Sequence, residues 1–203
     1  MRSNQVLVSL ILLIFLSACS SSGSAPIRYY VLEPIDQEAI NDSEISIQIV
    51  DLHIPQYLER FQMVTRAGRN ELVFSDSHQW GENLRKNLLR VLSVNLSALL
   101  GTPEVSTPLT RSKRKADIKV KIFVERFDQT HNGLIMLNAR YQIVESNTGA
   151  SLPQTYAFSG EIVNQSARNY PSMVGNMGKL YNELSADIAR HLVVHHLKAQ
   201  ERE

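Results

Sequence analysis

The sequence predicts an α+β fold of two layers: a single mixed, mostly antiparallel sheet with two long helices packed on one of its faces. Three observations predict this fold. Several segments alternate apolar and polar residues, as strands with one buried face do. Two longer segments, near 80–99 and 171–198, repeat apolar residues at helical spacing. Asn132-Gly133 offers a tight turn between two of the alternating segments.

Four short strands are predicted in the first part of the chain. Residues 27–34 form the first, and residues 43–55 form the second, with isoleucines at every other position. A proline ends each of these segments. Two further strands, near 62–65 and 71–74, lie on either side of a turn that contains Gly68.

The first long helix is predicted to follow directly. Asp76 or Ser77 is placed to cap it, and Gln79 lies three residues after Asp76, as a capping box requires. Trp80 is the first member of the apolar stripe, and Gly101 is the expected stop.

The second part of the chain predicts three longer strands and the last helix. Residues 116–129 and 134–146 alternate along a hairpin, and residues 155–163 form a further strand. A long helix follows from about Pro171 to Lys198. The whole predicts one sheet of five to seven strands, with the helices on its buried face.

The apolar segment at the N-terminus ends at Cys19, the only cysteine in the sequence. This run is about half of the roughly 20 residues that a spanning helix needs, so it predicts a secretory signal. Leu16-Ser17-Ala18-Cys19 resembles the bacterial lipoprotein box, which implies cleavage before Cys19 and acylation of its sulfur and new amine. Ser20 replaces the aspartate that usually retains such proteins in the inner membrane, which implies the outer membrane, facing the periplasm. A plain signal or an anchor helix is the alternative.

The sequence therefore divides into a signal peptide (1–18), a lipidated tether (19–26) and one domain (27–199). Removing the first 18 of 203 residues leaves 185, which is enough for a proper core. Without Arg2, 20 Lys and Arg face 20 Asp and Glu. A balanced charge argues against a nucleic-acid partner.

Four stretches of the chain carry a family resemblance. They are "RYYVL" (28–32), "VDLHIPQYLERFQMVTR" (50–66) with its Pro-x-Tyr-Leu elbow, "SDSHQWGENLRKNLLRVLSVNLSALL" (75–100), and "IKVKIFVERFDQTHNGLIMLNARYQIVESNTG" (118–149) with Phe-Asp before the turn. In this order, behind a lipoprotein box, they resemble the PqiC/YmbA-type lipoproteins, auxiliary components of ABC-type or MCE-type transport systems.

The resemblance implies a non-enzymatic protein that docks on an MCE-domain protein and helps to move phospholipids between the two membranes. It also implies a homo-oligomer, plausibly a ring, and no cofactor. A rival hypothesis is a lipoprotein that carries a lipid or glycolipid in its own apolar cavity. The apolar residues of both predicted helices are all expected to pack in the core, which disfavours a cavity. Neither G-x-S-x-G, H-E-x-x-H nor a phosphate-binding glycine loop occurs, so we expect no catalysis.

Four residues are candidates for binding the partner. Tyr57 and Leu58 lie in the elbow after Pro55, in a loop that either faces a partner or places Tyr57 at the edge of the core. Phe123 and Phe127 alternate with charged residues on the outward face of a strand. Aromatic side chains there indicate an interface, unless the N-terminal segment or a loop covers them.

Two polar clusters each allow a functional and a purely structural interpretation. Residues 111–115 hold four basic residues in five, which suit acidic headgroups or an acidic partner, or simply a solvated loop. Asp187, His191 and His195 follow one another at intervals of four along a helix. That spacing suits zinc, but no fourth ligand is evident, and we predict no metal.

Overall fold

The computed structural model describes residues 26–34, 45–110, 115–146 and 152–201. The segments that alternate apolar and polar residues form strands in these ranges. The two segments with apolar residues at helical spacing form the long helices. The elements are β1 (Arg28–Tyr30), β2 (Ile47–His53), the 3-10 helix η1 (Gln56–Leu58), β3 (Gln62–Arg66), β4 (Leu72–Trp80), α2 (Leu84–Leu100), β5 (Val105–Ser106), β6 (Ile118–Thr130), β7 (Leu134–Glu145), β8 (Gln154–Val163) and α3 (Tyr170–Gln200).

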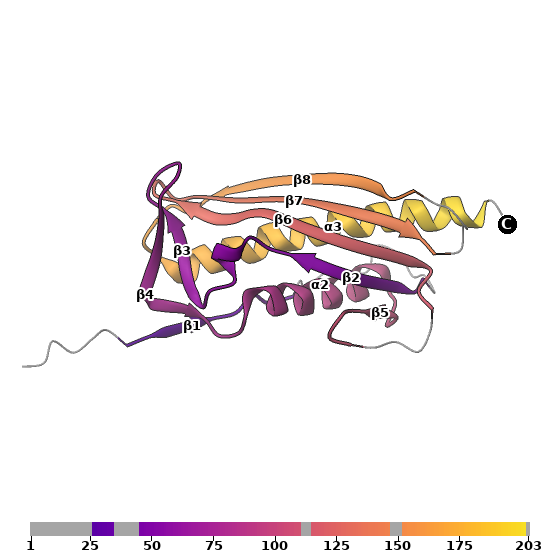
Figure 1. Cartoon of the computed structure of the whole chain (residues 1–203), viewed down its shortest axis with the longest axis horizontal. Helices are drawn as coiled ribbons and strands as arrows, with labels where there is room; N and C mark the ends of the chain where they lie inside the picture. Colours follow the sequence, from indigo (N-terminus) through magenta and orange to yellow (C-terminus); the bar gives the residue numbers. More distant parts are fainter. Residues whose placement is uncertain (1–25, 35–44, 111–114, 147–151, 202–203) are drawn as a thin grey trace, which may run out of the picture.

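The eight strands belong to one mixed sheet built around β6 (Figure 1). β6 pairs antiparallel with β7 along most of its length, and β7 pairs antiparallel with β8. On its other side, β6 pairs in parallel with β2 at one end and with β3 at the other. In the sheet, β4 pairs with β3 and β1 pairs with β4. On the other edge, β5 pairs with β2. The predicted fold class is confirmed, and the sheet has eight strands rather than five to seven.

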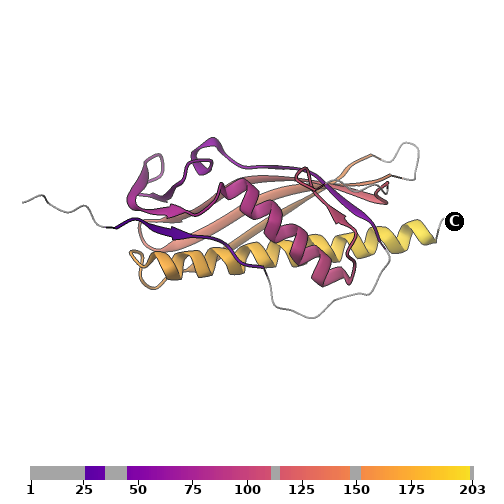
Figure 2. The same cartoon turned by 90° about the horizontal axis from the view of Figure 1, so that it is seen from below.

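Both long helices cover the same face of this sheet (Figure 2). Apolar side chains from α2, α3 and the sheet form one buried cluster between the layers. Polar groups fasten the helices to each other: the Tyr181 hydroxyl donates to the Leu88 carbonyl at 2.9 Å, and the Asn95 amide donates to Ser185 at 3.0 Å. Because these groups are paired, their burial carries little penalty.

Within the described part of the chain, no long helix covers the opposite face of the sheet, which we call the open face. Along β7 buried residues alternate with partly exposed or exposed ones, and β6 follows the same pattern as far as Val124. The intervening side chains of β6 are charged or aromatic, from Lys119 to Glu125. A sheet with one packed face and one solvated face is the arrangement expected of long antiparallel ladders.

The start of the first helix differs from the prediction. Trp80 is the last residue of β4, and α2 begins at Leu84, where the Asn83 side chain accepts from the Lys86 N–H at 3.2 Å. Asp76 lies within β4 and caps nothing. The backbone of residues 72–80 pairs with strands on both sides, and this pairing outweighs the local capping signal. Gly101 ends the helix with φ of 63°, as predicted.

The turn at Gly133 and the last helix are confirmed. Gly133 has φ of 87°, and a Cβ there would clash with the Asn164 carbonyl oxygen, so the turn requires glycine. α3 begins one residue before the predicted start and ends two residues after the predicted end. Its first turn lies at the same end of the molecule as β1 (Figure 1).

Candidate functional site

The elbow between β2 and β3 presents one aromatic side chain along the open face. Pro55 fixes an extended backbone before η1. Leu58 is 2% exposed and anchors the elbow in the core, whereas Tyr57 is only partly buried. The prediction that Leu58 faces a partner is wrong, because its side chain fills the core edge instead.

Tyr57 is held by a buried carboxylate on β6. Its hydroxyl donates to Asp128 Oδ2 at 2.8 Å. The same oxygen accepts from Arg66 Nε at 2.8 Å, and Asp128 Oδ1 accepts from Arg126 Nε at 2.9 Å. The Asp128 side chain has no exposed surface, while the two arginines remain about one quarter exposed. A buried carboxylate with three donors is held in one position, because any movement breaks a charge-assisted hydrogen bond.

The electrostatics of this network keep the phenol neutral. Burial and the negative charge of Asp128 raise the pKa of Tyr57 to about 12. At neutral pH the hydroxyl therefore donates to the carboxylate, and its oxygen also accepts from Arg66 Nη2 at 3.5 Å. The arrangement positions Tyr57, Arg66 and Arg126 around one carboxylate.

The network joins two stretches that the sequence keeps far apart. Tyr57 belongs to the Pro-x-Tyr-Leu elbow, and Asp128 to the Phe-Asp pair that precedes the turn. Sequence reasoning missed Asp128, Arg66 and Arg126 as members of the site. The available signal was the Phe127-Asp128 pair in the family stretch, since a carboxylate next to a large apolar residue of a strand needs hydrogen-bond partners if it is buried.

A shallow hollow adjoins the elbow. Its volume is about 430 Å³, and it is lined by Gln56, Tyr57, Glu59, Arg60 and Phe74. The Arg60 guanidinium lies 4.9 Å from the centre of the Phe74 ring, and the guanidinium of Arg66 covers Tyr57 at 5.5 Å. Phe61, next to Arg60, is 55% exposed. Aromatic and arginine side chains thus gather around the elbow, a composition that protein interfaces favour.

The two phenylalanines of β6 have different surroundings. Phe123 is partly exposed on the open face, where its ring stacks on His53 with 5.7 Å between centroids. Phe127 is fully buried and packs beside Tyr181 of α3. The prediction that Phe127 faces outward is therefore wrong. The ladder with β7 shifts register between Val124 and Arg126, and this bulge turns the following residues over.

The residues considered for zinc are engaged in hydrogen bonds between α3 and the sheet. Asp187 accepts from the Tyr141 hydroxyl at 2.7 Å, and that hydroxyl lies 2.7 Å from His191 Nδ1. His195 bonds instead with Glu145, at 3.0 Å. Within the described ranges, no three His, Cys, Asp or Glu side chains are grouped to hold a metal ion.

Several predicted features lie outside the described residues. They are the signal peptide (1–18), the acylation site Cys19, the tether apart from Pro26, and the basic run apart from Lys115. No helix in the described part of the chain is both long and apolar enough to cross a bilayer.

Two solved structures share this fold. The crystal structure of an uncharacterized protein has a TM-score of 0.67 at 18% identity, covering 83% of this chain and 99% of that one. A protein from Xanthomonas campestris, assigned to the family DUF330, has a TM-score of 0.68 at 12% identity, covering 87% and 99%. At these identities the likeness extends to the fold alone. A search of curated proteins gives no match.

The family resemblance seen in the sequence is confirmed. Residues 30–189 match the family described as "ABC-type transport auxiliary lipoprotein component", to which the PqiC/YmbA-type lipoproteins belong. The match spans nearly all of the described domain, including both halves of the Tyr57–Asp128 network. The chain belongs to the family of ABC-type transport auxiliary lipoproteins.

Proposed function

We propose that this chain is a non-catalytic accessory subunit of an intermembrane lipid transport system. Acyl chains on Cys19 hold it on the periplasmic face of the outer membrane, and its domain docks on an MCE-domain transport protein. Copies of the chain assemble with one another as a ring. Membership of a transport auxiliary family supports a transporter as the partner.

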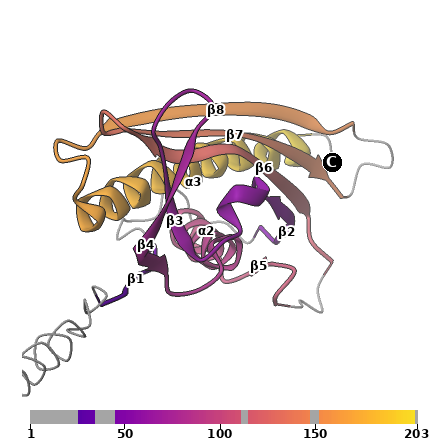
Figure 3. The same ribbon diagram turned by 60° about the vertical axis from the view of Figure 1, so that its left-hand side comes forward.

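The observation that carries the proposal is the surface around the elbow, which we call the elbow surface: Tyr57, Arg60, Phe61 and Phe74, with Phe123 farther along the same open face. Helices cover the other face of the sheet, so the open face is where a large partner has access. Figure 3 shows η1 beside β2, β3 and β6. Aromatic and arginine anchors on such a surface contribute most of the binding energy in protein interfaces.

The buried network under the elbow supports a docking role in a second way. Asp128 holds Tyr57 and two arginines in fixed positions before any partner arrives. Side chains that are already ordered lose less conformational entropy on binding.

In-cell photocrosslinking tests the docking surface. A photoreactive residue is placed at Phe61 or Phe123, and at Val94 on the exposed side of α2 as a matched control. We expect an MCE-domain protein to be captured from the first two positions and not from Val94. Capture from Val94 alone, or from none of the three, would contradict the proposal.

The anchor is tested separately by mass analysis of the mature product. We expect an N-terminus at Cys19 that carries three acyl chains, and a protein found with the outer membrane after fractionation. An unmodified sulfhydryl on a protein released in the soluble fraction would contradict the anchoring part of the proposal.

A further inference from the structure

The first strand presents a row of apolar side chains to solvent. Ile27, Tyr29 and Val31 alternate along β1 and its flanking residues, and they are 46%, 63% and 40% exposed. Alternate residues of a strand point to the same face. Tyr29 and Val31 do lie side by side, because a Cβ added at Gly81 would meet Tyr29 Cβ at 3.8 Å and Val31 Cγ1 at 3.3 Å. Single exposed apolar residues are normal, but a contiguous row indicates a contact surface.

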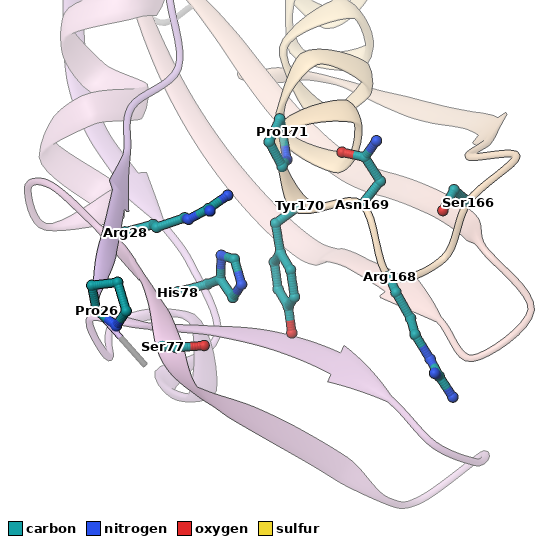
Figure 4. A pocket seen from close by; sticks show the side chains of 9 residues that line it. All are labelled: Pro26, Arg28, Ser77, His78, Ser166, Arg168, Asn169, Tyr170 and Pro171. Carbon is teal, nitrogen blue, oxygen red and sulfur yellow. The ribbon is translucent and has the colours of Figure 1, made fainter. Parts of the chain in front are cut away.

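The other face of β1 is fastened to the domain, so the row stays on the outside. The Tyr30 hydroxyl lies 2.8 Å from His78 Nδ1. The Leu32 N–H donates to Asn87 Oδ1 at 2.7 Å, and the Leu32 carbonyl accepts from the same amide group at 3.1 Å. Figure 4 shows the Arg28 side chain on this fastened face as well, beside His78. These contacts hold the strand in one orientation, which leaves the apolar row facing away from the core.

The row lies where the chain enters the domain from its proposed anchor. β1 lies at one end of the molecule, beside the start of α3 (Figure 1). Pro26 is seven residues after Cys19, and an extended chain spans at most about 3.6 Å per residue. If Cys19 is acylated, Pro26 therefore stays within roughly 25 Å of the bilayer surface. Glu33, the next residue of the same alternation after Val31, is charged and exposed, so the apolar row is confined to the part of the strand nearest the anchor.

We infer that Ile27, Tyr29 and Val31 contact the lipid surface of the membrane that carries the anchor, and this inference rests on the proposed acylation of Cys19. Tyrosine suits the boundary between headgroups and hydrocarbon, because its ring is apolar and its hydroxyl is polar. The isoleucine and the valine on either side supply apolar area, which sets the strength of binding to a bilayer surface. Acyl chains limit the distance of the domain from the membrane, and the row also sets its orientation.

Nitroxide spin labels test this contact on the mature full-length chain, reconstituted in vesicles of phosphatidylethanolamine and phosphatidylglycerol. Cys19 is the only cysteine in the sequence, so once its sulfur is acylated an introduced cysteine is the only free thiol. The label is placed through Tyr29→Cys or Val31→Cys. Val194→Cys is the matched control, because this valine of α3 is 45% exposed and lies in the last part of that helix. Arg28→Cys reports on the other face of β1.

Power saturation compares how often each label collides with oxygen, which concentrates in hydrocarbon, and with a water-soluble nickel chelate. We expect the ratio of oxygen to chelate collisions to be several-fold higher for the labels at Tyr29 and Val31 than for those at Arg28 and Val194. Combining Ile27→Asp with Val31→Asp should return the label at Tyr29 to the control ratio, because a charged side chain is costly to bring into an apolar environment. Circular dichroism checks that this double variant, changed only at exposed positions, keeps its fold.

The outcomes separate lipid from other occupants of the row. If the chain floats with the vesicles but the labels at Tyr29 and Val31 give the Val194 ratio, the inference is overturned while the anchor stands. Few collisions with either reagent, together with spectral broadening by a neighbouring spin label, would assign the row to a second copy of the chain and overturn lipid contact. An unchanged ratio in the double aspartate variant would show that the anchor alone brings the label to the bilayer, which overturns the inference too. A chain that does not float contradicts the anchoring proposal itself, and lipid contact fails with it.

Discussion

Phe123 and Phe127 are four residues apart on β6 and serve opposite faces of the sheet. Phe127 has no exposed surface and lies 6.2 Å from the Tyr181 ring, within the layer that joins sheet to helices. Phe123 lies on the open face, between His53 and the Lys121 ammonium group. The comparison shows that one strand supplies both the core and the surface that we assign to docking.

A single bulge creates the difference. From Ile118 to Val124, alternate residues point to the helices. Two residues, Glu125 and Arg126, then intervene before the next buried position, so Phe127 and Asp128 change faces relative to strict alternation. The same change brings Asp128 beneath Tyr57. The bulge therefore buries one phenylalanine and also builds the network under the elbow.

The largest effect is expected on the helix-covered face. Phe127→Ala should lower the free energy of unfolding by about 3–5 kcal/mol, because it leaves a cavity beside Tyr181. Urea denaturation followed by circular dichroism measures this loss. Phe127→Leu, which fills most of the space, should cost less. If the alanine variant loses less than about 1 kcal/mol of unfolding free energy, Phe127 is not packed in a core and the contrast with Phe123 fails.

The next effect concerns the buried carboxylate. Asp128→Ala should cost about 3 kcal/mol, because Arg66 and Arg126 are left together without their shared anion. Glu125 provides the control, because it lies on β6 like Asp128 but forms an exposed ion pair, with Arg140 of β7. Glu125→Ala should change stability by no more than about 0.5 kcal/mol. Equal losses of unfolding free energy in the Asp128→Ala and Glu125→Ala variants would show that the burial of Asp128 contributes nothing to stability.

A smaller and pH-dependent effect is expected at Tyr57. Tyr57→Phe removes one hydrogen bond to a charged group, worth about 1.5 kcal/mol. The pKa of Tyr57 is raised to about 12, so folding favours the protonated phenol. The stabilising contribution is therefore complete below the unfolded value near 10 and is lost as pH rises toward 12. Urea denaturation at pH 8 and pH 11 should show that the difference in unfolding free energy between the parent and Tyr57→Phe shrinks at the higher pH. An equal difference at the two pH values would contradict this.

The smallest effect on stability is expected at Phe123. Phe123→Ala removes a partly exposed ring from the open face, and it should cost less than about 1 kcal/mol. The same urea titration used for Phe127→Ala makes the measurement directly comparable. A loss as large as that of Phe127→Ala would mean that Phe123 is a core residue in solution.

Much of the fold could be predicted from local pattern. Alternation identified the long hairpin strands, and glycine at 101 and 133 marked a helix end and a turn. The start of α2 was misplaced because the caps at Asp76 and Ser77 compete with strand pairing, which depends on residues far away in the sequence. Local signals cannot weigh such long-range pairing.

The site was harder to predict. Tyr57 was found because the elbow belongs to a recognisable family stretch, and Phe123 because it interrupts a charged strand face. Asp128, Arg66 and Arg126 were missed because their meeting depends on the bulge and on the parallel pairing of β3 with β6. Neither feature leaves a periodic trace in the sequence.

The affinity of Phe123→Ala for the proposed MCE-domain partner tests the division between the two faces most directly. The full mature chain and this variant are titrated onto the immobilised partner protein, beside the unfolding measurement. We predict an affinity loss of about tenfold, equivalent to about 1.4 kcal/mol, in a protein whose stability is nearly unchanged. Unchanged affinity, in a variant that folds like the parent, would contradict the assignment of the open face to docking.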